Sequence, residues 1–391
     1  MTGDDDAARN DGLSDGELLV RFEPVIRFNE GEYFLPASVE SFVARCELWD
    51  KALPSAPIVG AGALDIDRLV ALTSGATARH HLRLVSEPAT WTESAVWQRR
   101  RVRPRFRAET RLGRVGVLTR LIDAGAQFSL LTRGSTPRGA QVAAALLDRD
   151  RPDHGDHPYY GRVVSNAGYT VLQYWFFYYF NDWRSRAHGV NDHEGDWEQV
   201  TIFLAGTGEL TPAWVAFSAH DEVGADLRRR WDDPDVTMVG DHPVVHAGLG
   251  SHAGAALPGE YLITVRPNRL ARVRSIATSV SRFFQPWTSG ESRTSVGVPF
   301  VEYARGDGVA IGPGTQHPWR QNIIGDDTPW VREYSGLWGN DTNDRLGGER
   351  GPAGPRYERN GAVRMSWADP VGWAALEAVS PSDDVGDVIA T

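Results

Sequence analysis

Residues Tyr174–Glu198, YWFFYYFNDWRSRAHGVNDHEGDWE, carry the strongest structural signal in the sequence. It opens with a run of aromatic residues up to Phe180, which is typical of a strand buried on both faces. A short polar loop leads to the pattern H-x-x-D-W-E, in which His193, Asp196 and Glu198 carry the polar groups. Binding sites are built where polar side chains converge in front of rigid apolar support. The sequence therefore places a candidate site at the end of a buried strand.

The polar residues of this stretch form a candidate metal site. In a strand, Asp196 and Glu198 share one face and Trp197 lies on the other, with His193 three residues upstream in the loop. Oxygen ligands with a single His suit Mg²⁺, Mn²⁺ or Ca²⁺ better than a structural Zn²⁺, which prefers Cys and His. The alternative is a set of solvated ion pairs with the loop arginines 184 and 186. We favour a functional polar site with four members, Asp182, His193, Asp196 and Glu198.

Two further strand-like segments end in a histidine. One ends in SAHD, which contains His220, and the other in GLGSHAG, which contains His252. If neighbouring strands bring them together, His193, His220 and His252 would line one cavity with the carboxylates. The alternative for each histidine is a structural hydrogen-bonding role. His246 occupies a position that faces the core.

Neither segment matches a standard catalytic motif. GLGSHAG resembles the dinucleotide fingerprint, but Pro258 and Gly259 follow too soon for the helix that this fingerprint requires. Ser218 and Ser251 are not in a G-x-S-x-G turn, so serine hydrolysis stays a minor alternative. A fourth stretch, WVREYSGLWG at 330–339, predicts an aromatic plug that closes the sheet, with a headgroup- or carbohydrate-stacking surface as the alternative.

Composition limits the kind of protein. The chain has 391 residues, of which 41% are hydrophobic, so it can bury a large core. A net charge of −10 argues against nucleic acid as a partner. Cys46 is the only cysteine, which excludes an intramolecular disulfide framework. The acidic N-terminus shows no signal peptide, and no apolar run reaches the roughly 18–20 residues of a membrane span. We expect a soluble, cytoplasmic protein, with signal-independent export left open.

Outward from the central stretch, the second part of the chain predicts strands and the first part predicts helices. Helices are expected after Ser38, over 66–72, 113–125 and 138–147. Segments rich in β-branched and aromatic residues, separated by Gly, Pro, Asp or Asn, predict a mainly antiparallel sheet. Residues 268–330 show few convincing strands and predict long ordered loops. The strands are expected at 24–28, 159–164, 169–180, 197–204, 214–219, 243–249 and 260–267.

Several of these motifs occur together, and in the same order, in one family. PVIRFNEGEYFLPASVE, LQYWFFYYFN with HEGDWE, SAHD, GLGSHAG and YSGLWG with GPAGP resemble the vacuolar protein sorting-associated protein 62 family over roughly residues 20–375. The family name implies a sorting phenotype and defines no reaction.

A shorter likeness concerns the aromatic strand and H-x-x-D-W-E, which are similar to the centre of the necrosis- and ethylene-inducing toxins. The resemblance implies a β-sandwich in which Asp182, His193, Asp196 and Glu198 bind a divalent cation that engages sphingolipid sugar headgroups. Glu194-Gly195 replaces the basic and His residues of the toxin motif, so the metal is better supported than toxicity.

These observations predict a mainly antiparallel β-sandwich decorated with helices from the N-terminal third. We expect a disordered tail at 1–16, one domain at 17–379 (a partly helical part at 17–150, then sheet and long loops at 151–379) and a flexible tail at 380–391. The leading functional hypothesis is divalent-metal-dependent binding of polar lipid headgroups or glycans, with peripheral membrane contact. A metal-dependent hydrolase of a phosphoester or glycan, with His220 or His252 as general base, is the alternative. A structural scaffold without catalysis is the second alternative.

Overall fold

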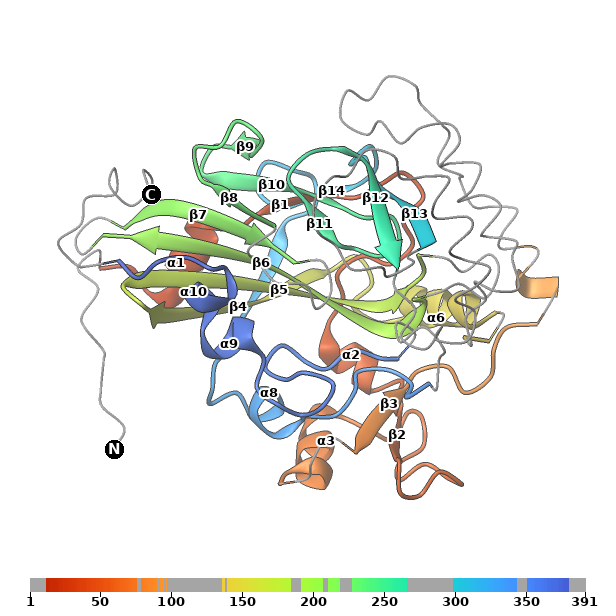
Figure 1. Cartoon of the computed structure of the whole chain (residues 1–391). Helices are drawn as coiled ribbons and strands as arrows, with labels where there is room; N and C mark the ends of the chain where they lie inside the picture. The colour runs from red at the N-terminus through yellow and green to blue at the C-terminus, as the bar shows by residue number, and fades with distance from the viewer. Residues whose placement is uncertain are drawn as a thin grey trace, which may run out of the picture.

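The computed structural model describes residues 12–75, 79–90, 92–94, 96, 136–137, 139–183, 191–206, 210–218, 227–265, 298–342 and 350–379. These residues form several β-sheets and a few short helices (Figure 1). The prediction of a mainly β fold is confirmed.

The central feature is a six-stranded sheet that the aromatic stretch crosses in the middle. Its neighbouring strands are antiparallel, except that the edge strand β15 runs parallel to β4. Every residue of β5 and of β6 is buried, because both faces of the sheet are covered. In spatial order the strands are β15 (Trp319–Ile323), β4 (His157–Asn166), β5 (Tyr169–Asn181), β6 (His193–Ala205), β7 (Thr211–Phe217) and β8 (Arg228–Arg230).

A smaller sheet packs on one face of the six-stranded sheet and lies above it in Figure 1. The ring of Phe28, just after β1, meets Tyr178 of β5 edge to face, with 6.3 Å between ring centroids. Residues of both sheets belong to one continuous hydrophobic core. The strands of the second sheet are β11 (Gly254–Ala255), β10 (His242–Ala247), β1 (Val25–Arg27) and β14 (Ala310–Ile311), and β9 (Met238–Val239) pairs with β10.

The other face of the six-stranded sheet is closed by aromatic residues. Trp338 is fully buried, and its ring lies 5.6 Å from those of both Phe177 and Trp197. Trp330 and Tyr334 complete this cluster at 5.4 and 5.5 Å from Trp338. The aromatic plug predicted for 330–339 is therefore confirmed, and these rings do not form an exposed stacking surface.

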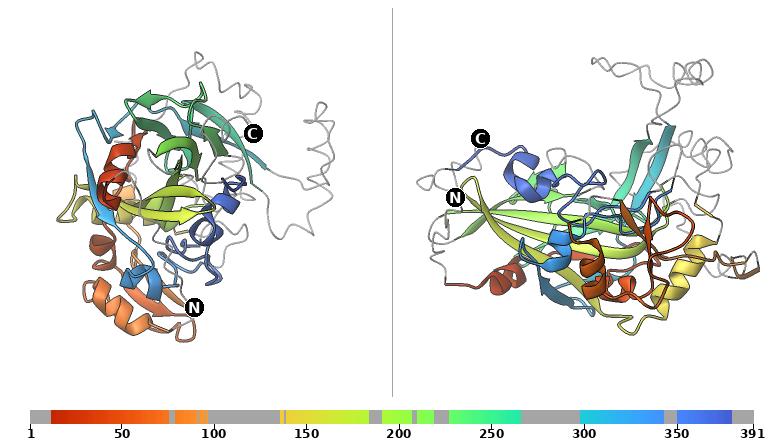
Figure 2. Two further views of the ribbon diagram at one scale, coloured as in Figure 1. Left: turned by 90° about the vertical axis from the view of Figure 1, so that its left-hand side faces the viewer. Right: turned by 90° about the horizontal axis from the view of Figure 1, so that it is seen from below.

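Two further pairs of strands and several helices surround the sheets. The pair β12 (Gly259–Val265) and β13 (Val298–Ala304) projects to one side, as Figure 2 shows, and β2 (Glu47–Asp50) pairs with β3 (His80–Arg83). No helix in the described parts of the chain is long and apolar enough to cross a membrane. The helices are α1 (Asp15–Phe22), α2 (Val39–Val43), α3 (Ile66–Thr73), α6 (Ala140–Arg149), α8 (Pro329–Glu333), α9 (Met365–Ala368) and α10 (Pro370–Trp373).

The structure corrects three expectations. The tail predicted to end at residue 16 is too long, because Ser14 and Glu17 form a capping box that starts α1 at Asp15. The region 268–330, expected to lack convincing strands, contains all of β13, β14 and β15. Strand β6 begins at His193, four residues before the predicted strand, so His193 is not in a loop. The helices after Ser38, at 66–72 and at 138–147 are confirmed, whereas 113–125 and 380–391 lie outside the described residues.

Candidate functional site

The candidate site lies where β5 ends and its antiparallel neighbour β6 begins. In the register of the two strands, Asp196 is opposite Tyr178 and His193 is opposite Asn181. Three of the predicted ligands, His193, Asp196 and Glu198, thus lie in β6. The fourth, Asp182, directly follows the adjacent strand β5. All four are at least 96% buried: Asp182, His193, Asp196 and Glu198.

Gly195 brings His193 and Asp196 to the same side of the sheet. Strict alternation along a strand would put residues three apart on opposite faces. Gly195 has a φ of +63°, in the left-handed region that glycine adopts without steric cost, and it interrupts the alternation. As a result, His193 Nε2 lies 3.9 Å from Asp196 Oδ1. The Glu194 carboxylate instead bonds to the backbone of Leu84 and Val85.

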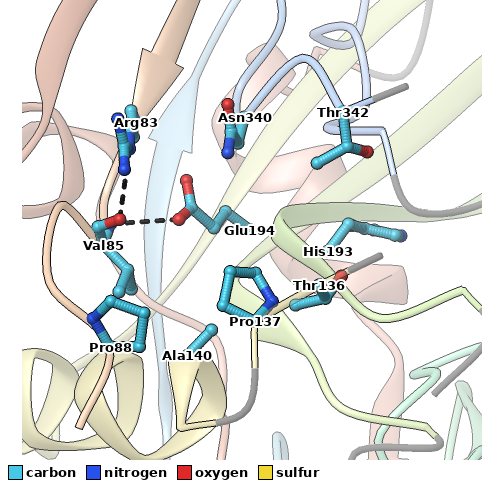
Figure 3. A pocket seen from close by; sticks show the side chains of 10 residues that line it. All are labelled: Arg83, Val85, Pro88, Thr136, Pro137, Ala140, His193, Glu194, Asn340 and Thr342. Carbon is cyan, nitrogen blue, oxygen red and sulfur yellow. Dashed lines mark hydrogen bonds between the residues drawn. The ribbon is translucent and has the colours of Figure 1, made fainter. Parts of the chain in front are cut away.

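Glu194 and His193 both line a small pocket with a cavity volume of about 40 Å³ (Figure 3). The Glu194 carboxylate accepts hydrogen bonds from the backbone N–H groups of Leu84 (2.8 Å) and Val85 (3.0 Å). Burial raises the pKa of Glu194 to about 7 in spite of these bonds. This carboxylate ties β6 to the chain after β3. The other lining residues are Arg83, Pro88, Thr136, Pro137, Ala140, Asn340 and Thr342.

The carboxylates of the candidate site each have a protein partner. Gln141 Nε2 donates to Asp182 Oδ2, and Ser218 Oγ donates to Glu198 Oε2 at 2.5 Å. Asp196 Oδ2 accepts from His252 Nδ1 at 2.8 Å. Within the described residues, no three His, Cys, Asp or Glu side chains are arranged around one point where a metal ion fits. Of the four predicted ligands the structure brings His193 and Asp196 into contact range, and the role of all four in metal binding stays a prediction.

His252 is the second predicted histidine that the structure brings to this site. It is 2% exposed, and its ring stacks on Tyr178 with centroids 3.8 Å apart and an interplanar angle of 2°. Burial by itself lowers the pKa of His252, but the hydrogen bond to Asp196 and the negative charges of Asp196 and Glu32 outweigh burial and raise the pKa to about 10. A ring that is protonated at neutral pH is a poor general base. The catalytic role of His252 therefore has no specific support, and His220 lies outside the described residues.

Sequence reasoning misses the contribution of Glu32, Gln141 and Ser218 to this site. Glu32 follows β1 and accepts a hydrogen bond from Gly250 N, 218 residues away in the chain. No motif or period links positions so far apart in sequence. The sequence presents Ser218 only as a possible nucleophile, whereas it donates to Glu198 and accepts from the Gln199 backbone N–H. The segment after Gly248 forms turns and then β11 in place of the helix that a nucleotide fingerprint needs.

His246 is buried, but it lies on the opposite face of β10 from the core residues Val245 and Ala247, so the predicted core-facing orientation is wrong. Its burial gives it a pH-dependent contribution to stability. Burial, with a smaller effect of the Arg27 charge, lowers the pKa of His246 from 6.5 to about 4. Above pH 6.5 the ring is neutral in both the folded and the unfolded chain. As pH falls towards 4, the unfolded chain binds the proton first, so folding becomes less favourable.

We expect this single group to cost the folded state about 3 kcal/mol between pH 6.5 and pH 4. In His246→Gln, which cannot titrate, that part of the pH dependence should be absent. Urea unfolding of both proteins at pH 7.0, 5.5 and 4.5 measures the difference. Parallel loss of stability in wild type and variant would contradict the assignment.

No family model matches the chain and no curated protein matches it, so its resemblance to the vacuolar protein sorting-associated protein 62 family stays a prediction. Among solved structures, it is distantly similar to necrosis- and ethylene-inducing proteins. Necrosis and Ethylene inducing Protein 2 from the causal agent of cocoa's Witches Broom disease is 21% identical over 25% of this chain and 41% of that chain, with a TM-score of 0.19. The chain spans about half the length of the solved structures it matches.

Two further similar structures are complexes of one protein, NLPPya, with amino sugars. The complex with mannosamine is 18% identical over 26% of this chain and 48% of that chain, with a TM-score of 0.19. The complex with glucosamine is 13% identical over 42% and 50%, with a TM-score of 0.21. These low scores describe a local likeness and not a shared overall fold.

Proposed function

We propose that this protein binds a divalent cation at Asp182, His193, Asp196 and Glu198, and through that cation a polar lipid headgroup or a glycan. The observation that carries the proposal is the orientation of His193. Its Nδ1 lies 2.6 Å from the carbonyl oxygen of Gly195. A carbonyl oxygen can only accept, so Nδ1 must donate. In the neutral ring Nε2 then has a lone pair, and this atom faces Asp196 Oδ1.

A ring nitrogen held by a backbone carbonyl is a common support for a metal-binding histidine, because the bond fixes the tautomer and the orientation of the ring. The 3.9 Å between His193 Nε2 and Asp196 Oδ1 is too long for a hydrogen bond. It is close to the separation of two ligands that each lie roughly 2.0–2.4 Å from one ion. These two atoms are therefore the proposed starting pair of the site.

The remaining ligands would have to turn towards the ion. Glu198 would give up its bond from Ser218, or Asp182 its bond from Gln141. Three carboxylates and one imidazole form a hard donor set, which favours Mg²⁺, Mn²⁺ or Ca²⁺ over Zn²⁺. When bound, such an ion supplies coordination positions for phosphate oxygens or sugar hydroxyls. The protein's own residues hold the ligand oxygens in place and supply the negative charge that attracts the cation.

Isothermal titration calorimetry with Mg²⁺, Mn²⁺ and Ca²⁺ tests this proposal. We expect wild type to bind one ion and Asp196→Asn to bind it at least tenfold more weakly, because the ion loses a charged ligand. Asp148→Asn is the matched control, since Asp148 is also a buried carboxylate in an ion pair, with Arg151, but lies in α6 outside the site. Equal affinities in wild type and Asp196→Asn would contradict the assignment.

The second part of the proposal concerns the ligand. Mannosamine, glucosamine and vesicles that contain sphingolipid with a sugar headgroup are suitable probes. Binding of one of these probes should disappear when EDTA removes the cation and return when the cation is added back. Binding that is insensitive to EDTA would separate the ligand from the metal and leave only the metal site.

A further inference from the structure

We propose that Glu32 is a positioning residue of the candidate site: it holds both Asp182 and Asp196 in place through the loop 248–254, without contacting a cation itself. This inference rests on the proposed function. Glu32 follows the turn after β1, and its side chain is 2% exposed. It therefore reaches the site from the segment after a strand of the second sheet, whereas the candidate ligands lie in or directly after strands of the six-stranded sheet.

The Glu32 carboxylate is fixed by backbone N–H groups of the two residues that follow it. Oε1 accepts hydrogen bonds from the N–H groups of Tyr33 at 2.9 Å and Phe34 at 3.3 Å. The ring of Phe34 packs on Phe180 of β5, 5.7 Å between centroids, which ties this short segment to the strand that leads to the site. A buried carboxylate with several donors is a fixed point from which other groups can be oriented.

One path from Glu32 leads to Asp182. Glu32 Oε2 accepts from Gly250 N at 2.8 Å, and Gly250 O accepts from Asp182 N at 2.9 Å. Gly250 has a φ of +75°, and a Cβ there would overlap Asp182 Oδ1. The loop thus approaches Asp182 as closely as a glycine allows. A shift of Gly250 would displace Asp182 directly.

The other path leads to Asp196. His252 Nε2 lies 3.7 Å from Glu32 Oε1, and His252 Nδ1 donates to Asp196 Oδ2. His252 has a φ of +59°, which costs energy for a residue with a side chain. Stacking on Tyr178 and the two flanking carboxylates hold the residue in that conformation. Glu32 is therefore connected to two candidate ligands: to Asp182, directly after β5, through Gly250, and to Asp196, in β6, through His252.

The test is Glu32→Gln, which keeps the size of the side chain but removes the charge and replaces one acceptor by a donor. We expect Mn²⁺ affinity to fall about 10- to 100-fold, as found when groups behind metal ligands are changed. The electron paramagnetic resonance spectrum of bound Mn²⁺ should also change, because the ligand geometry is altered; general destabilisation would not change this spectrum. Glu260→Gln is the matched control, since Glu260 is a buried carboxylate paired with Arg305.

The outcomes separate the two proposals. If wild type binds no Mn²⁺, the proposed function and this inference both fail. If wild type binds and Glu32→Gln has the same affinity and spectrum, the metal site stands and the positioning role is overturned. Should Glu32→Gln not fold, Glu32→Asp keeps the charge and shortens the reach by one methylene; its affinity should also fall, and an unchanged affinity overturns the inference.

Discussion

Trp338→Ala is expected to lower the free energy of unfolding by about 4 kcal/mol, because it opens a large cavity in the aromatic plug. Trp338 is 0% exposed and contacts four aromatic rings, so the space cannot be refilled by small movements. The rings are those of Phe177, Trp197, Trp330 and Tyr334. Urea unfolding followed by far-UV circular dichroism measures the loss.

The matched control for this substitution is Trp214→Ala. Trp214 lies in β7, is half-buried and packs on the smaller hydrophobic cluster. We expect a loss of about 1–2 kcal/mol there, in proportion to the smaller area withdrawn from water. Similar losses in the two variants would mean that the plug is not tightly packed around Trp338.

The plug also supports the candidate site. Trp197 lies between Asp196 and Glu198 in sequence and points to the opposite face, where Trp338 packs on it. Each tryptophan contact on one face therefore helps to fix the carboxylates on the other. This coupling explains why H-x-x-D-W-E combines two acidic residues with a large aromatic one.

The location of the site could be predicted from sequence because its signals are local. The unbroken aromatic run identifies β5, and the alternation after it places Asp196 and Glu198 on one face. Ser38 caps α2 as its residue type predicts, since its side chain accepts from Ser41 N. In each case the deciding residues lie within a few positions of one another.

The parts that sequence reasoning misses depend on partners far apart in the chain. Strand β15 is short, carries Arg, Gln and Asn, and is stabilised by parallel pairing with β4, about 160 residues earlier. The role of Glu32 likewise depends on Gly250 and His252. Local composition contains no information about such pairs, because tertiary contacts override local preference.

The sequence indicates that Gly195 is unusual but does not predict its conformation. A glycine inside a strand pattern is typical of a bulge or of close backbone approach. Close approach applies here, since φ is +63° and a Cβ at this position would overlap the carbonyl oxygen of Trp338, while the register of β5 and β6 continues unchanged past it. In the sequence, this residue is one of two departures from the toxin motif. In the structure, it decides which side His193 faces.

Gly195→Ala is accordingly expected to cost about 3–5 kcal/mol of folding free energy. The left-handed conformation accounts for about 1–2 kcal/mol, and displacing the backbone of Trp338 accounts for the rest. Gly240→Ala is the matched control: its φ is +60°, but nothing lies within 4 Å of the added Cβ, so only the conformational cost should remain. Urea unfolding of the two variants isolates the steric part as their difference.

The same variant tests the link between fold and site. Relief of the clash at residue 195 requires β6 to move away from Trp338 or Gly195 to leave the left-handed region. Either change rotates His193 relative to Asp196, whose facing atoms are 3.9 Å apart. Any Mn²⁺ affinity of the folded Gly195→Ala protein should therefore fall at least tenfold, while Gly240→Ala keeps the affinity of wild type. A folded Gly195→Ala protein with unchanged affinity would show that the orientation of His193 does not determine cation binding.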